Sequence, residues 1–279
     1  GMDRFSGHWN SVASGDFDGD GRLDLVAGNL GLNTAYSLYG TGDFRLWYGD
    51  LDGNGTRDLV ETYESEGRWL PMRDRSVLAR SLPHLEQLFP THGAFAQADI
   101  DAMTATEESP QPYLELNFLE SAIFLNRGGR FEALPLPTDV QMAPVFGVSV
   151  VDANADGQED LFVGQNFFGY ETRLTRDDSG QGRLLLGLGD GRFEPVGSEV
   201  SGIRLEGEQR GVASADFDQD GRVDLAVAQW NGPTALFRNI YPEQGYRIEL
   251  LGIDSNLFGI GSRLRLRDVE GHLGPSRIV

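Results

Sequence analysis

Four short segments of the chain repeat the pattern D-x-[DN]-x-[DN]-G-x-x-D. They are residues 16–24, 50–58, 152–160 and 216–224, here called loops 1 to 4. In each loop, acidic or amide side chains occupy positions 1, 3, 5 and 9, and glycine occupies position 6, where the backbone must turn sharply. Oxygens at alternate positions, with a backbone carbonyl at position 7, are the ligands that Ca²⁺ prefers. Four matches in the same register therefore predict four calcium-binding loops.

The expected cofactor is Ca²⁺, with up to four ions, each held by five residues of its loop. Four of these residues would use their side chains, and the residue at position 7 would use its carbonyl. The expected ligands, in loop order, are Asp16, Asp18, Asp20, Arg22 and Asp24; Asp50, Asp52, Asn54, Thr56 and Asp58; Asp152, Asn154, Asp156, Gln158 and Asp160; and Asp216, Asp218, Asp220, Arg222 and Asp224.

The EF-hand is the main alternative, because it shares the opening D-x-D-x-D-G. It also needs a bidentate glutamate at position 12 and a helix on each side of the loop. Only loop 2 has a glutamate there, Glu61, while the other loops have alanine or valine. The segments after the loops, such as Leu161-Phe162-Val163, are short and apolar, as strands are. The sequence therefore rejects the EF-hand and predicts strand, cation loop and strand in each unit.

The chain is strongly acidic, with 43 Asp and Glu residues against 23 Lys and Arg and a formal net charge of −20. Fourteen of these acids lie at the predicted ligand positions, and four bound calcium ions would change the net charge from −20 to −12. No basic patch is visible, which argues against nucleic acid as a partner, since phosphate binding needs one.

Cysteine is absent, so disulfides, zinc–thiolate sites and cysteine nucleophiles are excluded. No apolar run approaches the roughly 20 residues that a membrane-spanning helix needs. Weak calcium loops fill at about millimolar calcium, as in extracellular modules. We therefore expect an extracellular, periplasmic or cell-surface location, with Gly1-Met2 a tag remnant and the signal peptide outside this sequence.

Other repeated features predict the fold. Residues 95–101 are similar to residues 212–218, which suggests a fifth repeat whose cation loop has decayed at Met103 and Thr104. Glycine-rich turns followed by an aromatic residue, at 40–44, 127–132 and 189–194, predict β-hairpins. Repeats with about four strands each predict an all-β fold, a β-propeller with about five detectable blades.

Residues 73–92 differ from the rest of the chain. Their apolar residues recur at helical spacing, and Pro83 interrupts the pattern. We expect a short helical insertion of two pieces between the second and third blades.

Loops 1 and 4 resemble the VCBS/FG-GAP repeats, which also form the blades of integrin α-subunit heads. The resemblance covers residues 8–240, and residues 241–279 are similar to the start of an ASPIC/UnbV-type domain. It implies a propeller domain at 1–240 with up to seven blades, followed by a β segment at 241–279. It also implies a calcium-loaded module of secreted or surface proteins, used for adhesion or ligand binding.

The strand after each loop should end on the rim opposite the cations. Amides and aromatic residues follow these strands, which suits a carbohydrate or peptide ligand. The alternative is that the amides close turns and the rings seal neighbouring blades. The candidate ligand-binding residues are Asn29, Gln165, Asn166, Tyr170, Gln229 and Trp230.

The sequence favours a non-catalytic binding or adhesion module for a glycan or protein. The four histidines are scattered, and no nucleophile motif occurs. The rival is a lyase-type enzyme acting on polysaccharides, in which Tyr170 or Arg173 would serve as the base. A purely structural module is a third possibility.

Overall fold

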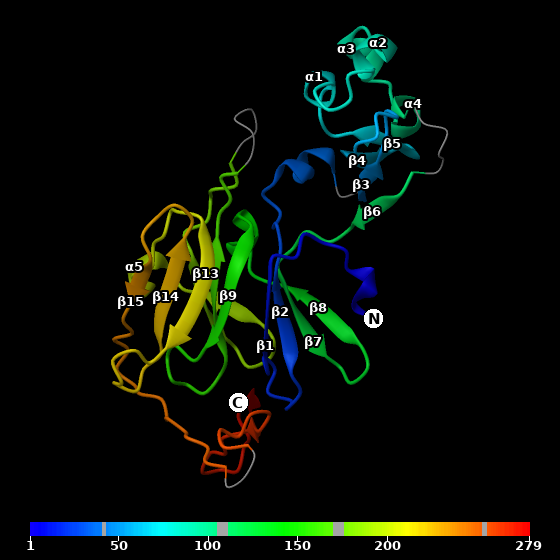
Figure 1. The fold of residues 1–279 in the computed structure, drawn as a ribbon. Coiled ribbons are helices and arrows are strands. Elements are labelled where there is room, and N and C mark those ends of the chain that lie inside the picture. Colours follow the sequence, from blue (N-terminus) through cyan, green and yellow to red (C-terminus); the bar gives the residue numbers. More distant parts are fainter. Residues whose placement is uncertain (41–42, 105–110, 170–175, 253–255) are drawn as a thin grey trace. The chain divides into compact units, whose positions relative to one another are not determined.

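The structure, a computed structural model, divides the chain into two compact units (Figure 1). Unit 1 comprises residues 1–4, 8–35 and 119–279, and unit 2 comprises residues 5–7 and 36–118. Each unit is treated by itself below. The residues described are 1–40, 43–104, 111–169, 176–252 and 256–279.

Besides a two-stranded ladder near the C-terminus, unit 1 contains three antiparallel sheets, called blades 1 to 3 here, in which each strand pairs with the next. Blade 1 consists of β1 (Ser11–Gly15), β2 (Asp24–Gly28), β7 (Ala122–Asn126) and β8 (Phe131–Pro135). Blade 2 consists of β9 (Val145–Val151), β10 (Asp160–Gln165), β11 (Arg183–Gly187) and β12 (Phe193–Pro195). Blade 3 consists of β13 (Gln209–Ala215), β14 (Asp224–Gln229) and β15 (Ala235–Phe237).

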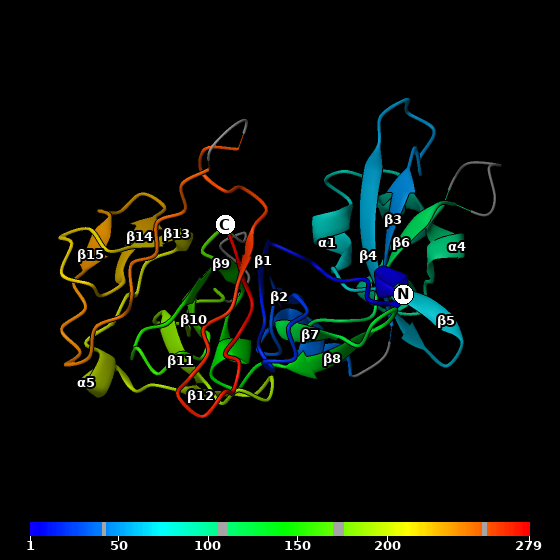
Figure 2. The ribbon, with the colours of Figure 1, turned by 90° about the horizontal axis from the view of Figure 1, so that it is seen from below.

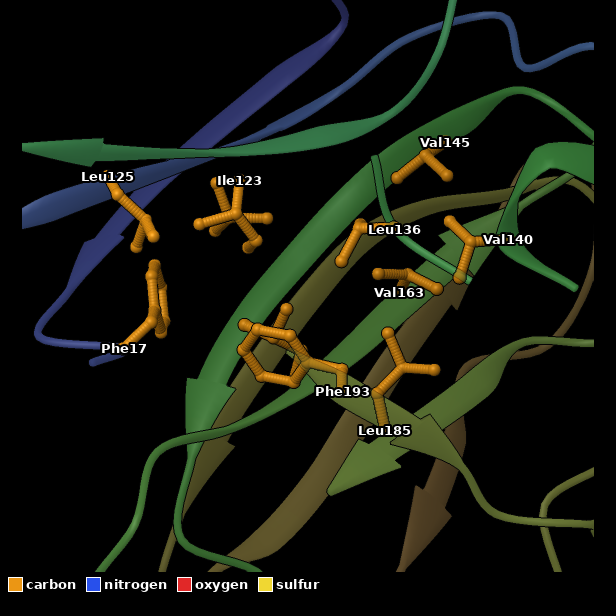
Figure 3. Close-up of a cluster of buried hydrophobic side chains, with 11 residues drawn as sticks. Phe17, Ile123, Leu125, Leu136, Val140, Val145, Val163, Leu185 and Phe193 are labelled. Atoms are coloured by element: carbon orange, nitrogen blue, oxygen red, sulfur yellow. The ribbon is translucent and has the colours of Figure 1, made fainter. Parts of the chain in front are cut away.

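Blade 2 lies between the other two blades and is buried on both faces. Every residue of β10 is buried. Leu161 and Val163 join a cluster with residues of blade 1 (Figure 3). Phe162, on the other face, joins a cluster with Leu225 and Val227 of blade 3. Burying such a side chain contributes about 1.5–3 kcal/mol. This two-sided burial explains why the β10 sequence is continuously apolar rather than alternating.

The first strands of the blades are neighbours, with β9 in contact with both β1 and β13. A first strand beside the first strand of the next blade is the arrangement of a β-propeller. The predicted all-β propeller-type fold, with several antiparallel sheets and a few short helices, is confirmed.

Unit 2 contains one antiparallel sheet with the strand order β5-β4-β3-β6. Trp47 of β3 and Val60 of β4 belong to a buried cluster with apolar residues from the helical segment. The strands are β3 (Phe44–Gly49), β4 (Asp58–Ser65), β5 (Arg68–Pro71) and β6 (Tyr113–Leu116). The helices are α1 (Arg75–Leu78), α2 (Leu85–Leu88), α3 (His92–Phe95) and α4 (Ile100–Met103).

The interpretation of residues 95–104 as a decayed strand-loop-strand repeat is wrong. Asp99 is the N-cap of α4, and its side chain accepts a hydrogen bond from the backbone N–H of Ala102 at 3.1 Å. Ile100 and Met103 are buried in the core of unit 2. The pattern that resembled a cation loop is therefore explained by a helix: Asp99 caps its N-terminus, and its two apolar residues face the core.

The order of repeats along the chain also differs from a simple succession. Strand β2 pairs with β7, so blade 1 starts before residues 36–118 and is completed after them. The turns at 127–132 and 189–194 are hairpins, β7–β8 and β11–β12, as predicted. The turn at 40–44 instead follows the 3₁₀ helix η2 (Ala35–Tyr39), and its residues 41–42 lie outside the described part.

The remaining elements are short. Near the C-terminus, β16 pairs with β17 in a two-stranded ladder. No helix among the described residues is long and apolar enough to cross a membrane. These elements are η1 (Met2–Arg4), η3 (Val140–Met142), α5 (Ser198–Ser201), β16 (Arg263–Leu264) and β17 (Arg277–Ile278).

Candidate cation-loop sites

Each predicted loop joins two antiparallel neighbouring strands. Loop 1 joins β1 to β2, loop 2 joins β3 to β4, loop 3 joins β9 to β10, and loop 4 joins β13 to β14. The prediction of strand, loop and strand is confirmed in all four cases, and no loop has the flanking helices of an EF-hand.

Two positions in each loop have a left-handed backbone. At position 6, the glycines have φ between +84° and +92°, as the pattern predicted. Position 4 also has positive φ, and here the residue is glycine only in loops 1 and 2, while Ala155 and Gln219 adopt 56° and 61°. The glycines at position 4 of loops 1 and 2 were the available sequence signal for this second turn.

Hydrogen bonds within each loop orient its oxygens. In every loop, the backbone N–H at position 5 donates to the side-chain oxygen at position 3, at 3.1–3.3 Å. The N–H at position 7 donates in the same way to position 5, at 2.7–3.0 Å. These Asx-type turns fix the loop conformation through the chain's own side chains.

The aspartate at position 9 connects its loop to the rest of the sheet. Asp24 accepts hydrogen bonds from the backbone N–H of Phe17 at 2.9 Å and of Asn126, at the end of β7, at 2.7 Å. Asp160 and Asp224 make the equivalent pair of bonds in blades 2 and 3. The sequence predicted these residues only as ligands, and their bond to the third strand was missed.

Burial raises the pKa of the position-9 carboxylic acids. The pKa of Asp24 and the pKa of Asp160 are each raised to about 6, because desolvation outweighs their backbone hydrogen bonds. Burial also raises the pKa of Asp58 in loop 2. Deprotonated forms of these groups need compensating positive charge or hydrogen bonds.

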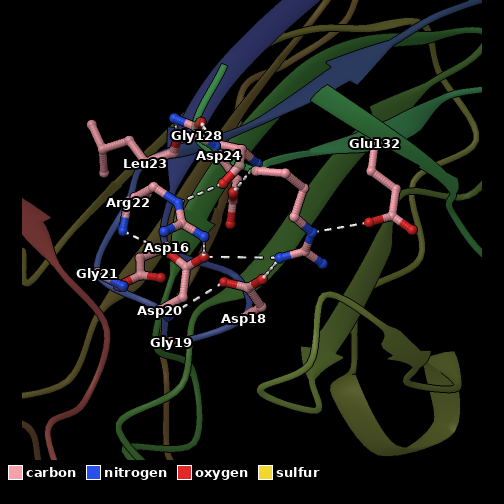
Figure 4. Close-up of polar contacts among 12 residues, drawn as sticks. Asp16, Asp18, Gly19, Asp20, Gly21, Arg22, Leu23, Asp24, Gly128 and Glu132 are labelled. Atoms are coloured by element: carbon pink, nitrogen blue, oxygen red, sulfur yellow. Dashed lines mark hydrogen bonds and ion pairs between the residues drawn. The ribbon is translucent and has the colours of Figure 1, made fainter. Parts of the chain in front are cut away.

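Carboxylate oxygens converge in three of the loops. In loops 1, 2 and 4, oxygens from positions 1, 3 and 9 all lie within 4.8 Å of one another. In loop 3, position 3 is Asn154, which offers an amide oxygen in place of a carboxylate. Asp16, Asp18 and Asp24 of loop 1 are seen together in Figure 4.

Two buried oxygens fit a cation in particular. Oδ1 of Asp16 and Oδ1 of Asp152, both at position 1, have no hydrogen-bond partner among the described residues. Leaving such an oxygen unsatisfied costs about 1–3 kcal/mol, and more for a charged group. The residues present therefore fit a hard divalent cation, which would satisfy these oxygens with the ligands that it prefers.

Arginines surround the outer carboxylates of loops 1 and 4. Arg127 pairs with Asp18. Arg22 pairs with Asp20 (Figure 4). In loop 4, Arg238 lies 2.6 Å from Asp218, and Arg222 lies 2.9 Å from Asp220. The sequence predicted Arg22 and Arg222 only as carbonyl ligands at position 7. Arg127 and Arg238 were missed, although each lies next to the asparagine that bonds the position-9 aspartate.

Three of the predicted ligand-rim residues are fully buried. Asn166 donates to Gly180 O at 2.8 Å, Gln165 donates to Val140 O at 3.2 Å, and Asn29 accepts from Leu30 N at 2.8 Å. These side chains are therefore buried and hydrogen-bonded to backbone groups, and they are not accessible to a ligand.

The other two described rim candidates, Gln229 and Trp230, are at least partly exposed to solvent. Gln229 is partly buried and donates to Pro233 O at 2.8 Å, whereas Trp230 is 72% exposed. Tyr170 and Arg173 lie outside the described residues.

Side chains that could serve catalysis have structural partners. His84 Nε2 lies 2.8 Å from Met103 O, and Glu115 pairs with Arg45 at 3.3 Å. In unit 2, Glu61 accepts a hydrogen bond from the hydroxyl of Tyr36 at 2.7 Å and pairs with Arg73 at 2.8 Å.

Comparisons with known proteins agree with the repeat pattern. Residues 8–45 match the FG-GAP repeat, and residues 172–227 match the FG-GAP-like repeat. The chain is 39% identical over 238 residues to cartilage acidic protein 1 of Xenopus tropicalis, covering 81% of this chain and 32% of that protein. It is 26% identical over 239 residues to the Mus musculus protein of the same name, with the same two coverages.

The chain thus spans about a third of the length of these relatives. The two repeat matches include loops 1 and 4 with the strands β1, β2 and β13 and the first four residues of β14. The chain therefore carries FG-GAP repeats and is homologous to cartilage acidic protein 1.

Proposed function

We propose that this chain is a calcium-stabilised, non-catalytic binding module of the propeller type. The observation that carries the proposal is the unpartnered, buried Oδ1 of Asp16 within a cluster of three carboxylates in an FG-GAP repeat. Up to four Ca²⁺ ions would bind loops 1 to 4. Each ion would join the two strands beside its loop and remove the repulsion between neighbouring carboxylates.

Thermal unfolding in EGTA and in ~1 mM CaCl₂ tests the calcium proposal. An ion that binds only the folded state stabilises it by about 2.7 kcal/mol per site at ~100 times its Kd. We expect a large upward shift in Tm on adding calcium, and a smaller one on adding magnesium, which prefers a more rigid geometry and retains its water. Unchanged melting in EGTA and in calcium would contradict the proposal.

The proposed ligand is a glycan or a protein, bound away from the cations. Trp230 supports this, because it is an exposed aromatic residue among the rim positions that the structure describes, and exposed rings stack well on sugars and on peptide side chains. A glycan array and a pull-down from extracellular matrix extract, each with wild type and Trp230→Ala, would test it. Equal binding by the two proteins would remove Trp230 from the site.

The lyase alternative has a direct test. A lyase acting on uronate-containing polysaccharides generates an unsaturated product that absorbs ultraviolet light. We expect no turnover, in the presence or absence of calcium. Turnover that Arg173→Ala or Tyr170→Phe abolishes would replace the binding proposal with an enzymatic one.

We also propose an exported location and a separate C-terminal segment. Loops of this kind fill at the calcium concentrations found outside cells. Residues 1–240 would form the propeller region, with residues 241–279 beginning an ASPIC/UnbV-like segment. Limited proteolysis with and without calcium, with cleavage sites mapped on each side of residue 240, would show whether residues 1–240 and 241–279 unfold separately.

A further inference from the structure

A buried serine of the C-terminal segment, Ser276, lies against loop 1. The backbone N–H of Ser276 donates to Oδ2 of Asp16 at 2.6 Å, and Gly21 N donates to the same oxygen at 3.0 Å. Ser276 has no exposed surface, and its Oγ has no hydrogen-bond partner among the described residues. Oδ1 of Asp16 is likewise buried and unpartnered. Two unsatisfied oxygens therefore belong to two residues in direct contact.

Loops 2 and 4 do not have this arrangement. Both carboxylate oxygens of Asp50 accept backbone hydrogen bonds, from Asn54 N and Gly55 N at 2.9 and 2.8 Å. Both oxygens of Asp216 do the same, from Asp220 N and Gly221 N at 3.0 Å each. In loop 1, by contrast, the position-1 aspartate takes a hydrogen bond from a backbone N–H of the C-terminal segment and keeps a second oxygen unpartnered. Asp152 of loop 3 also keeps an unpartnered oxygen, but its other oxygen pairs with the side chain of Arg277 at 3.2 Å.

The C-terminal segment is held on loop 1 by arginines that do not use the predicted ligand atoms. Arg265 donates to Gly19 O at 2.7 Å, and Arg263 donates to Gly21 O at 3.1 Å. These carbonyls are at positions 4 and 6, whereas the ligand carbonyl is at position 7. Arg263 and Arg265 therefore place Ser276 beside Asp16 without themselves bonding the predicted ligand atoms of loop 1. The segment is seen from the loop end of unit 1 in Figure 2.

We propose that Ser276 Oγ is a ligand of the calcium ion in loop 1, so that the bound ion fastens the C-terminal segment onto blade 1. A hydroxyl is a neutral oxygen ligand of the kind that completes the six to eight positions around Ca²⁺. It lies only a few ångströms from its own amide nitrogen, which already contacts Asp16. The proposal rests on calcium binding by loop 1.

Calorimetric titration with CaCl₂ tests the ligand role. The background protein carries Asp52→Ala, Asn154→Ala and Asp218→Ala, which disable loops 2 to 4 and leave loop 1. In this background, we expect Ser276→Ala to weaken calcium binding roughly tenfold, the order of loss that follows removal of a supporting group at a metal site. Ser262→Ala, in the same C-terminal ladder, is the matched control and should leave the affinity unchanged.

Hydrogen exchange provides a second readout, in chains in which loops 2 to 4 are left intact. Calcium should slow exchange at residues 256–279, and the Ser276→Ala variant should lose most of this slowing. If the background protein binds no calcium, the proposed function of loop 1 fails. If calcium binds wild type and Ser276→Ala equally well, or leaves exchange at the C-terminus unchanged, calcium binding stands and the role of Ser276 is overturned.

Discussion

Loops 1 and 2 have the same ligand pattern and the same internal turns, but their surroundings differ. In loop 1, Asp16 and Asp24 are buried, and Arg22 and Arg127 neutralise the outer carboxylates. In loop 2, residues 53–57 are exposed, and among the described residues no basic side chain pairs with Asp50 or Asp52 within 4.0 Å. The nine-residue pattern is therefore sufficient for the loop conformation, while the surrounding protein decides how the loop's charge is balanced.

The largest expected difference concerns the position-9 aspartates in calcium-free buffer. Asp24→Ala leaves two backbone N–H groups without partners, the buried one of Phe17 and the partly buried one of Asn126. At about 1–3 kcal/mol for each group, we expect a loss of about 4 kcal/mol. Asp58→Ala removes one such bond, to Leu51 N, and should cost about half as much. Urea unfolding in EGTA measures both, and equal losses would contradict the structural role of Asp24.

The second prediction concerns pH without calcium. The folded-state pKa values of Asp24 and Asp160 are raised to about 6 and that of Glu159 to about 7, all mainly by burial. The folded state therefore binds more protons than the unfolded state between about pH 4 and 7. The stabilising effect of these groups is complete below the unfolded pKa and is lost as the pH rises through 6 to 7.

We therefore expect the Tm in EGTA to fall between pH 5 and pH 7.5. With saturating calcium the direction should reverse, because the ion binds the deprotonated carboxylates. A Tm that rises with pH in EGTA would show that burial does not control these groups.

A smaller difference in stability is expected between alanine substitutions at the position-6 glycines of loops 1 and 2. Gly21 and Gly55 have φ of +92° and +84°, so replacing either with alanine should cost about 1–2 kcal/mol through backbone strain. A Cβ at Gly21 would also lie 2.6 Å from Nη1 of Arg265, whereas a Cβ at Gly55 would meet nothing within 4 Å. Gly21→Ala should therefore destabilise the protein more and also speed hydrogen exchange at residues 261–279. Identical effects of the two variants would argue against docking of the C-terminal segment on loop 1.

The smallest expected effects come from position 3. In EGTA, Asp18→Asn loses an ion pair with the partly exposed Arg127, a change of at most about 1 kcal/mol. Asp52→Asn instead relieves repulsion with Asp50 and Asp58 and should stabilise the apoprotein by about 0.5 kcal/mol. In calcium, both variants should melt below wild type. Measuring the Tm of each variant in EGTA and in calcium checks the direction of each change. A lower Tm for Asp52→Asn than for wild type in EGTA would refute the predicted relief of repulsion.

Several features could be predicted from local sequence alone. The loops and their flanking strands follow from residues within nine positions of one another, because alternate aspartates, a glycine turn and short apolar runs are local patterns. The continuous apolar run of β10 is also a local sign of a strand buried on both faces.

A local pattern was also misleading at one position. Asp99 followed by Ile100 and Asp101 looks like the start of a cation loop, but a short polar side chain serves equally well as a helix N-cap. Burial of Ile100 and Met103 in unit 2 favoured the helix. Met103 and Thr104, in place of the acidic residue and the glycine of a cation loop, were the local sign against such a loop. The choice of a helix instead depends on what the apolar side chains pack against.

The sequence by itself determined the loop geometry, the strand content and the acidic ligand sets, since each depends on neighbouring residues. Only the tertiary structure decided that β7 rather than a sequential neighbour pairs with β2, that Asp24 bonds Asn126, and that Ser276 lies on Asp16. These contacts join residues about 100 to 260 positions apart. Which distant segment supplies the partner depends on the packing of the whole unit, and that information is not present in any single segment.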